Sequence, residues 1–354
     1  MRQTAKGPGE EPLQQGESTK VKGVWIASDM DANGWLANRE RAARRHLAQF
    51  SERAPSWLRP GLAYLGGGAL CLRLLGPGNG PGVLAAVRLP DRALGPLAVA
   101  VPSLFAAHIF VVRRCGTMQQ LEEARRSPLV LSLTAFGLGV MGATAGAIVG
   151  RCGGLRSILS GGRDDGHLAL GLFLGSLSVY HYAEYATVVR YNPSMVTIDS
   201  FLVNQRSYIV AMAFAVTEYF SEAYLLPGLK GWAPLRWLGL AGMLFGEFFR
   251  KGALIQAGHN FTHQISDTEK RDNHELVTSG VYAFSRHPGY FGWFWWSIST
   301  QVLLCNPVAT AVFTYVSWRF FRDRIPYEEW HLCRYFPDYP AYRERVPTRI
   351  PFIP

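Results

Sequence analysis

An uncharged run of 30 residues, from Gly289 to Trp318, constrains the fold of this chain more than any other stretch. It is too long for one simple membrane crossing, which takes about 20 residues, and too short for two full crossings. Asn306-Pro307 lies in its second half, where proline removes a backbone donor and favours a break. The run therefore predicts a membrane hairpin over 289–318, with two helices joined by a tight turn at this dipeptide.

Further apolar runs precede the hairpin in a chain of 354 residues, of which 48% are hydrophobic and 18% charged. The charges lie mostly in blocks between uncharged segments, which is typical of a polytopic membrane protein. With the hairpin, the runs predict an all-α integral membrane protein of about eight transmembrane helices, although hydropathy alone supports five to eight. The expected spans before the hairpin are 61–75, 93–112, 129–150, 167–183, 208–226 and 235–255.

The chain carries 36 basic and 26 acidic residues, which gives a formal charge of +10. Basic residues at the cytosolic flanks of membrane helices account for this excess. No basic face is interleaved with a soluble fold, so nucleic acid is not an expected partner. The five cysteines are scattered and match neither a zinc signature nor a disulfide framework, so no metal site is expected.

Composition divides the chain into three parts. Residues 1–59 are rich in Gly, Gln, Glu and Arg and predict a polar, disordered cytosolic extension. Residues 60–258 hold the predicted transmembrane bundle. Residues 259–354 predict a catalytic region that contains the membrane hairpin and an amphipathic cytosolic segment after it. The polar stretch 259–281 supports this assignment, because it is long for an unstructured connection and such loops tend to be functional.

Polar and aromatic groups crowd the first end of the hairpin. Arg286-His287-Pro288 comes directly before it and Tyr290 lies just inside. A histidine before a helix N-terminus, with aromatic side chains one turn inside, can hold a polar or cationic ligand. The alternative is structural: Arg286 reaches to the interface, Pro288 begins a helix and the nearby tryptophans form an interfacial belt.

Charged groups also stand at the other end of the hairpin. Arg324 and Glu328 are four residues apart and would share a helix face, although Pro326 argues against a continuous helix there. The alternative is a solvated charge run at the membrane exit. Between the two regions, His274-Glu275 could form a wet rim around a ligand, or a loop packed on the membrane surface.

Ionisable residues inside the apolar runs are functional candidates by default. Glu184 and Glu218 are two of these. Glu247 and Arg250 stand three residues apart, and we expect them to neutralise one another, with Arg250 also a candidate anion contact. His263 is expected to be a hydrogen-bonded structural residue rather than a metal ligand.

Taken together, these motifs resemble the isoprenylcysteine carboxyl methyltransferase family. The resemblance extends from about residue 171 to the end and is dense after Glu247. A His-Pro-x-Tyr motif with a downstream Glu-Glu also occurs in other membrane methyltransferases and in sterol reductases, whereas the whole ordered series is specific. The series comprises Asp199-Ser200-Phe201-Leu202, Phe245-Gly246-Glu247, Arg250-Lys251, Phe261, His263, His274-Glu275-Leu276-Val277-Thr278-Ser279-Gly280-Val281-Tyr282, Arg286-His287-Pro288, Gly292-Trp293, Thr300-Gln301, Asn306-Pro307, Trp318-Arg319-Phe320-Phe321-Arg322-Asp323-Arg324, Arg345-Val346-Pro347 and Pro351-Phe352-Ile353.

The resemblance implies an eight-helix enzyme of the endoplasmic reticulum membrane, with its active site facing the cytosol. Such an enzyme transfers a methyl group from S-adenosylmethionine to the C-terminal carboxylate of a farnesyl- or geranylgeranyl-cysteine. The implied partners are prenylated CaaX proteins, such as small GTPases, and membrane lipid. Carried over position by position, the cofactor contacts fall on His274, Glu275, Leu276, Val277, Tyr282, His287, Pro288, Gly289, Tyr290 and Glu328.

Arg324 matches the family's substrate position. An α-carboxyl group has a pKa of about 3.5 and is already ionised, so it needs no general base. Arg324 and Arg250 are therefore the expected catalytic groups, because arginine pairs bidentately with carboxylates. Two residues depart from the family pattern: Gly289 stands where serine is usual, and Ser299 replaces a common glycine.

Other functions remain open at this stage. A phospholipid N-methyltransferase would share the cofactor-binding lip of the hairpin, the stretch Arg286 to Tyr290. It would methylate an amine, however, and would have little use for Arg324. A sterol reductase would instead bind a reduced nicotinamide cofactor. A non-enzymatic scaffold would have no need of polar motifs at both ends of the hairpin.

Overall fold

The computed structural model describes residues 20–21, 24–25, 60–61, 63–66, 117–154, 156, 167–263 and 273–354. The chain divides into two units, Met1–Ser56 and Trp57–Pro354. In the first unit, β1 (Lys20–Val21) pairs antiparallel with β2 (Val24–Trp25). The remainder of the extension expected over 1–59 lies outside the described residues.

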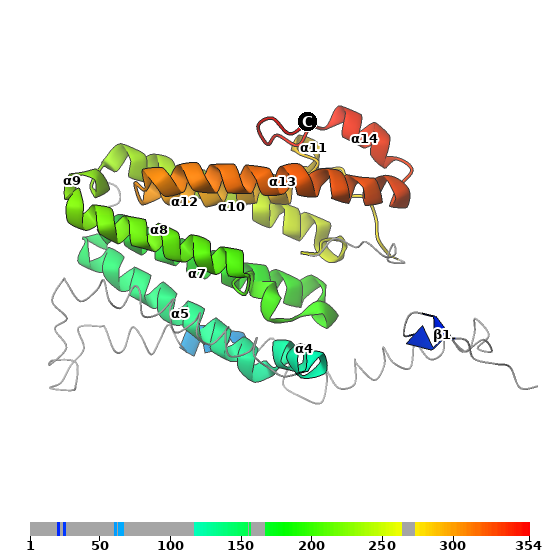
Figure 1. Ribbon diagram of the computed structural model, residues 1–354, viewed down its shortest axis with the longest axis horizontal. Helices are drawn as coiled ribbons and strands as arrows, with labels where there is room; N and C mark the ends of the chain where they lie inside the picture. Colours follow the sequence, from blue (N-terminus) through cyan, green and yellow to red (C-terminus); the bar gives the residue numbers. More distant parts are fainter. Residues whose placement is uncertain are drawn as a thin grey trace, which may run out of the picture. The chain divides into compact units, whose positions relative to one another are not determined.

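Long helices lying side by side make up most of the described part of the second unit (Figure 1). All of its regular elements in the described ranges are helical, which confirms the all-helical expectation for this unit. The long helices are α5 (Pro128–Arg151), α7 (His167–Tyr191), α8 (Arg206–Leu225), α10 (Ala233–Ala257), α12 (Pro288–Leu303) and α13 (Pro307–Tyr335). The short ones are α4 (Met118–Arg126), η2 (Pro193–Met195), η3 (Ile198–Phe201), α9 (Pro227–Lys230), η4 (Gly258–Asn260), α11 (Val281–Phe284) and α14 (Tyr339–Arg345).

Helices α5, α7 and α10 cover the spans expected at 129–150, 167–183 and 235–255, and α8 covers the span expected at 208–226 except for its last residue. The span expected at 93–112, and most of that at 61–75, lies outside the described residues. Within the described ranges, α5 alone is both long and apolar enough to cross a membrane by length and composition. Its 24 residues reach about 36 Å, more than the ~30 Å of a hydrocarbon core. The number of eight spans stays a prediction.

The predicted turn of the hairpin is confirmed, since α12 ends at Leu303 and α13 begins at Pro307. The buried ammonium of Lys230 holds this turn. It donates to the main-chain oxygens of Leu304 and Cys305 at 3.1 and 3.0 Å and to Asn306 Oδ1 at 2.7 Å. Glu222 balances its charge at 2.6 Å. The carbonyls at the end of α12, which lack intrahelical partners, are thus satisfied.

Glu218 of α8 has a structural function on the other side of the turn. Its carboxylate accepts from the main-chain nitrogens of Val308 and Ala309 at 2.7 and 2.6 Å. These are first-turn N–H groups of α13, which have no partner within the helix and favour negative charge. The apolar run around Glu218 therefore carries a carboxylate that caps a neighbouring helix.

The second arm of the hairpin is longer than its uncharged sequence. Helix α13 continues beyond Trp318 to Tyr335 with Pro326 inside it. The argument from Pro326 against a continuous helix is therefore wrong. The proline is exposed, so that the main-chain carbonyl it leaves without an N–H partner can be solvated. As a result, Arg324 and Glu328 lie one turn apart on one helix.

Helices α10 and α12 approach closely along a seam of glycines. A methyl group at Gly246 would lie 2.6 Å from Gly292 O and from Trp296 N. One at Gly239 would lie 2.3 Å from Leu303 N. Small residues that allow backbones to touch are typical of helix packing in membranes. This seam fixes the first helix of the hairpin against α10, and so fixes the lip that begins α12.

Candidate active site

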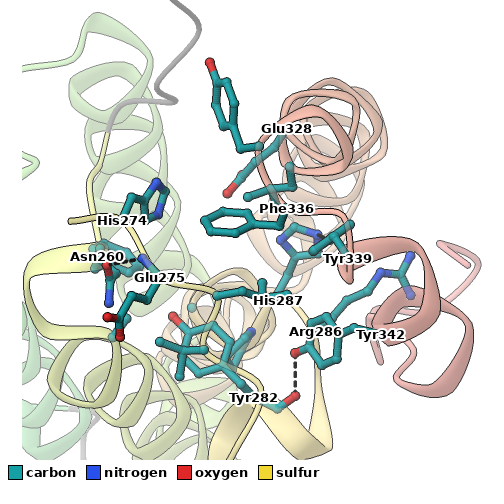
Figure 2. A pocket seen from close by; sticks show the side chains of 18 of the residues that line it. Asn260, His274, Glu275, Tyr282, Arg286, His287, Glu328, Phe336, Tyr339 and Tyr342 are labelled. Atoms are coloured by element: carbon teal, nitrogen blue, oxygen red, sulfur yellow. Dashed lines mark hydrogen bonds between the residues drawn. The ribbon is translucent and has the colours of Figure 1, made fainter. Parts of the chain in front are cut away.

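A cleft opens at the N-terminal end of α12, between the segment 273–282 and the helices α13 and α14 (Figure 2). The space within it amounts to about 940 Å³, part of which is open to solvent. The structure brings all ten residues predicted as cofactor contacts into its lining. They are His274, Glu275, Leu276, Val277, Tyr282, His287, Pro288, Gly289, Tyr290 and Glu328.

The floor of the cleft is built on the buried carboxylate of Glu329. Its Oε1 accepts from Arg286 Nε at 2.5 Å, from His287 Nε2 at 3.0 Å and from the Tyr339 hydroxyl at 3.3 Å. Burial alone would raise the pKa of Glu329, but the hydrogen bonds and charges of His287 and Arg286 lower it to about 2. Burial beside this carboxylate raises the pKa of Tyr339. The floor is therefore a preorganised ion pair, in which the guanidinium of Arg286 balances the charge of Glu329.

Arg286 also ties the C-terminal segment to the cleft. Its Nη1 and Nη2 donate to the main-chain oxygens of Val346 and Pro354, at 3.0 and 2.5 Å. The adjacent Ser285 hydroxyl donates to Thr348 O at 2.7 Å. Arg286 thus serves as a structural anchor, and the alternative that it only reaches to the membrane interface is wrong.

The two ends of the hairpin meet at Tyr290. Its hydroxyl donates to Glu328 Oε2 and accepts from Arg324 Nε at 2.8 Å. Arg324 Nη2 donates to the main-chain oxygen of His263 at 2.9 Å, and its guanidinium lies 5.5 Å from the ring centre of Phe320. Arg324 is outside the lining of the cleft and stands behind the Tyr290 wall.

The opposite rim is the segment that carries His274 and Glu275. The Glu275 main-chain nitrogen donates to Asn260 Oδ1 at 3.0 Å (Figure 2). The imidazole of His274 lies edge-on to Phe336 across the cleft, with ring centres 5.1 Å apart. Below them the Tyr342 hydroxyl donates to the Tyr282 main-chain oxygen at 2.6 Å, which closes the floor.

Sequence reasoning missed part of the lining. The aromatic residues after Glu328 read as an interfacial segment, whereas the structure turns several of them into the cleft. Their spacing of three to four residues along α13 was the available signal. The lining residues that were not predicted as direct cofactor contacts are Ala257, Asn260, Phe261, Thr262, Arg286, His331, Leu332, Tyr335, Phe336, Tyr339 and Tyr342, and of these Arg286 was part of the predicted ligand motif.

Arg250 is not among the lining residues, and its expected partner was wrong. Its Nε and Nη2 donate to Glu184 of α7 at 2.9 and 2.8 Å. Glu247 instead lies 3.6 Å from Lys251. His263 is confirmed as a hydrogen-bonded residue, with Nε2 donating to Glu184 at 2.7 Å. Glu247 and Arg250 were expected to pair because they stand three residues apart on α10. The carboxylate of Glu184 on α7 takes that place, since it accepts two well-formed hydrogen bonds from Arg250.

Fold and site together define a helical-bundle protein whose ligand cleft lies at the open end of a helical hairpin. The sequence profile described as the isoprenylcysteine carboxyl methyltransferase family matches residues 237–334. A protein-S-isoprenylcysteine O-methyltransferase from Xenopus laevis is 48% identical over 185 residues, 52% of this chain and 64% of that protein. A probable protein-S-isoprenylcysteine O-methyltransferase from Oryza sativa subsp. indica is 42% identical over 184 residues, 51% of this chain and 95% of the relative.

A solved structure resembles the fold as well. It is that of the eukaryotic intramembrane Ras methyltransferase, isoprenylcysteine carboxyl methyltransferase, with a TM-score of 0.66 and 28% identity. The match covers 85% of this chain and 99% of that one. The chain belongs to the isoprenylcysteine carboxyl methyltransferase family. It spans 64% of the length of the Xenopus relative and 65% of the length of the rat and human relatives.

Proposed function

We propose that this chain is an S-adenosylmethionine-dependent methyltransferase that methylates the C-terminal carboxylate of isoprenylated cysteine. One observation carries the proposal. The ten residues that family resemblance assigns to the cofactor line a single cleft, and Arg324, assigned to the acceptor, is hydrogen-bonded to its wall through Tyr290. Residues separated by up to 54 positions in sequence, His274 to Glu328, thus form one site.

The chemistry of the lining fits this methyl donor. When bound, S-adenosylmethionine supplies a methyl group on a positively charged sulfur. Glu328 and the aromatic face of Tyr290 favour a cation at the end of the cleft nearest Arg324. Aromatic side chains such as Phe336 and Tyr282 offer flat surfaces for a purine base. Glu275 and His274 supply polar groups at the rim.

Arg324 would hold the acceptor. It lies one helical turn before Glu328 on α13 and is hydrogen-bonded to Tyr290 of the cleft wall, so that a carboxylate paired with it would stand beside the cationic end of the donor site. The carboxylate is already ionised, and the protein's work is to remove its water and to orient it. Because opposite charges are neutralised during transfer, the rate gain comes mainly from orientation and preorganisation. The bonds from Arg324 to Tyr290 and His263 supply that preorganisation.

The proposal includes the membrane. A prenyl chain contributes about 0.8 kcal/mol per buried methylene, and an enzyme that accepts it from lipid must lie within the bilayer. The similarity to an intramembrane methyltransferase supports this placement. We accordingly place the chain in the endoplasmic reticulum with eight spans and the cleft facing the cytosol. Its proposed partners are prenylated CaaX proteins, with small GTPases among them.

Methyl transfer by isolated membranes tests the proposal. Membranes with the protein, and matched membranes without it, receive S-adenosylmethionine labelled in its methyl group and either N-acetyl-S-farnesylcysteine or phosphatidylethanolamine. We expect label on the farnesylcysteine as a base-labile ester. Label on the phospholipid amine alone would instead identify the protein as a phospholipid N-methyltransferase.

Two variants connect that activity with the site. Arg324→Ala should abolish transfer to farnesylcysteine. Arg322→Ala is the matched control, because Arg322 is exposed on the same helix. Its guanidinium carbon lies 5.2 Å from the ring centre of Trp318. Full activity of the Arg324 variant would refute its assignment to the acceptor.

A further inference from the structure

A buried carboxylate away from the cleft, Glu184 of α7, is the centre of a network of hydrogen-bond donors from basic side chains. Its Oε1 accepts from Arg250 Nε at 2.9 Å and from Lys251 Nζ at 2.7 Å. Its Oε2 accepts from Arg250 Nη2 at 2.8 Å and from His263 Nε2 at 2.7 Å. Four donors occupy the carboxylate, whose two oxygens offer about four lone-pair sites. The Glu184 side chain is 0% exposed and does not line the cleft.

Two connections lead from Glu184 to the proposed site. The first passes through Arg250, whose Nη1 donates to the main-chain oxygen of Gly289 at 3.2 Å, at the lip of the cleft. The second passes through His263, whose main-chain oxygen accepts from Arg324 Nη2 at 2.9 Å. One carboxylate in α7 therefore braces both the wall of the donor cleft and the residue that carries the acceptor.

Stability alone is a weak reason for such a cluster. Charges that leave water lose hydration, and well-packed apolar side chains are often as stabilising as a buried ion pair. A better reason is that the cluster fixes the orientation of its members. The Arg250 guanidinium and the His263 ring are each held in one direction by their hydrogen bonds to Glu184. The main-chain oxygen of Phe261 is also held by Asn192 Nδ2 at 3.0 Å, just after the end of α7, so that the segment 261–263 is anchored at two places, on Glu184 of α7 and on the residue that follows this helix.

We propose that Glu184 is a positioning residue for methyl transfer: through His263 and Arg250 it sets the place of Arg324 beside the donor lip. This inference rests on the proposed function, in which Arg324 binds the acceptor carboxylate. It assigns Arg250 to the same bracing role and removes it from direct contact with the acceptor.

The test compares Glu184→Gln with Glu247→Gln in the full-length protein in membranes. Both changes remove one carboxylate charge from the surroundings of Lys251, but among the described residues Glu247 forms no hydrogen bond or ion pair with Arg250 or His263. We expect Glu184→Gln to raise the KM for N-acetyl-S-farnesylcysteine about tenfold. The KM for S-adenosylmethionine should change much less. Glu247→Gln should leave the acceptor KM at the wild-type value.

A double-mutant cycle separates positioning from general damage. Arg324→Lys alone should raise the acceptor KM, and Glu184→Gln added to it should contribute less than about threefold more, because both act on one interaction. A full second tenfold rise would overturn the inference. So would an acceptor KM for Glu184→Gln equal to that of Glu247→Gln.

Folding is checked by gel filtration in detergent. If Glu184→Gln does not fold, His263→Ala replaces it, since this change cuts the bond to Glu184 but keeps the main-chain oxygen that Arg324 uses. An unchanged acceptor KM in His263→Ala would then overturn the inference. A wild-type protein that methylates no farnesylcysteine would instead defeat the proposed function itself.

Discussion

Two glycines of α12 test how closely α10 and α12 must approach. A methyl group at Gly292 would lie 2.4 Å from the Arg250 main-chain nitrogen and 2.5 Å from Gly246 O. The same methyl at Gly289 would lie 3.3 Å from the Phe261 ring and 3.4 Å from Arg250 Nη1. The neighbours of Gly292 are backbone atoms, which move only if the helices separate. Those of Gly289 are side-chain atoms, which can shift by a few tenths of an ångström.

These distances set the expected cost of each substitution. Relieving a 2.4 Å contact to an ordinary 3.4 Å requires α10 and α12 to separate by about 1 Å along the seam. Overpacking typically costs about 1–3 kcal/mol, so we expect Gly292→Ala to reach ~3 kcal/mol or more and Gly289→Ala to stay below ~1 kcal/mol. At about 2 °C per kcal/mol, these values correspond in thermal unfolding to a fall of roughly 6 °C or more against less than about 2 °C.

The assay is thermal unfolding of the purified protein in detergent, followed by tryptophan fluorescence at one heating rate. Gly289→Ala serves as the matched control, since it adds the same methyl group three residues earlier in the same helix. An apparent melting temperature for Gly292→Ala within about 2 °C of that of Gly289→Ala would refute the reasoning about the seam.

Three further predictions concern buried polar groups. Lys230→Met leaves Glu222 and two carbonyls of the hairpin turn without their cation, and should destabilise the protein by about 3–5 kcal/mol in the same unfolding assay; an unchanged melting temperature would contradict it. The pKa of Glu329 is lowered from 4.5 to about 2, so its charge stabilises the fold above pH 4.5, and this contribution is lost as pH falls from 4.5 to about 2. The melting temperature of the wild type should therefore fall more steeply over that pH interval than the melting temperature of Glu329→Gln. Parallel curves of melting temperature against pH for the two proteins would contradict a stabilising interaction of Glu329 with Arg286 and His287. His331 lines the cleft at 6% exposure, with no hydrogen-bond partner for Nε2 among the described residues; His331→Ala should weaken S-adenosylmethionine binding several-fold by equilibrium dialysis, and equal affinity would exclude a contact.

The sequence was enough to predict the turn of the hairpin and ten of the residues that line the cleft. A charge-free run with Asn306-Pro307 inside it allows few arrangements, and the structure has the turn there. The motif with Tyr290 and the charged residues Arg324 and Glu328 were expected at opposite ends of this hairpin. In the structure the Tyr290 hydroxyl joins the two ends, because it bonds to both Arg324 and Glu328. Local patterns were sufficient because proline and uncharged runs act on the nearest residues.

Long-range pairing was not accessible in the same way. Glu184 and Arg250 are 66 residues apart, and nothing in either segment specifies that α7 faces α10 at that level. The nearby Glu247 therefore looked like the natural partner. The residue Ser299 shows the same limit: its Oγ lies 2.2 Å from where a methyl on Gly242 would stand, so a departure from the family glycine is accommodated by a glycine on another helix.

Binding of the methyl donor to the cleft tests the central claim most directly. The dissociation constant of S-adenosylmethionine is measured by calorimetry in detergent for the wild type, Glu328→Ala and Glu344→Ala. Glu344 is exposed on α14 and serves as the matched control. We predict saturable binding to the wild type and to Glu344→Ala, and affinity at least about tenfold weaker for Glu328→Ala. Equal affinity in all three proteins, or no binding to the wild type, would contradict the assignment of this cleft to the methyl donor.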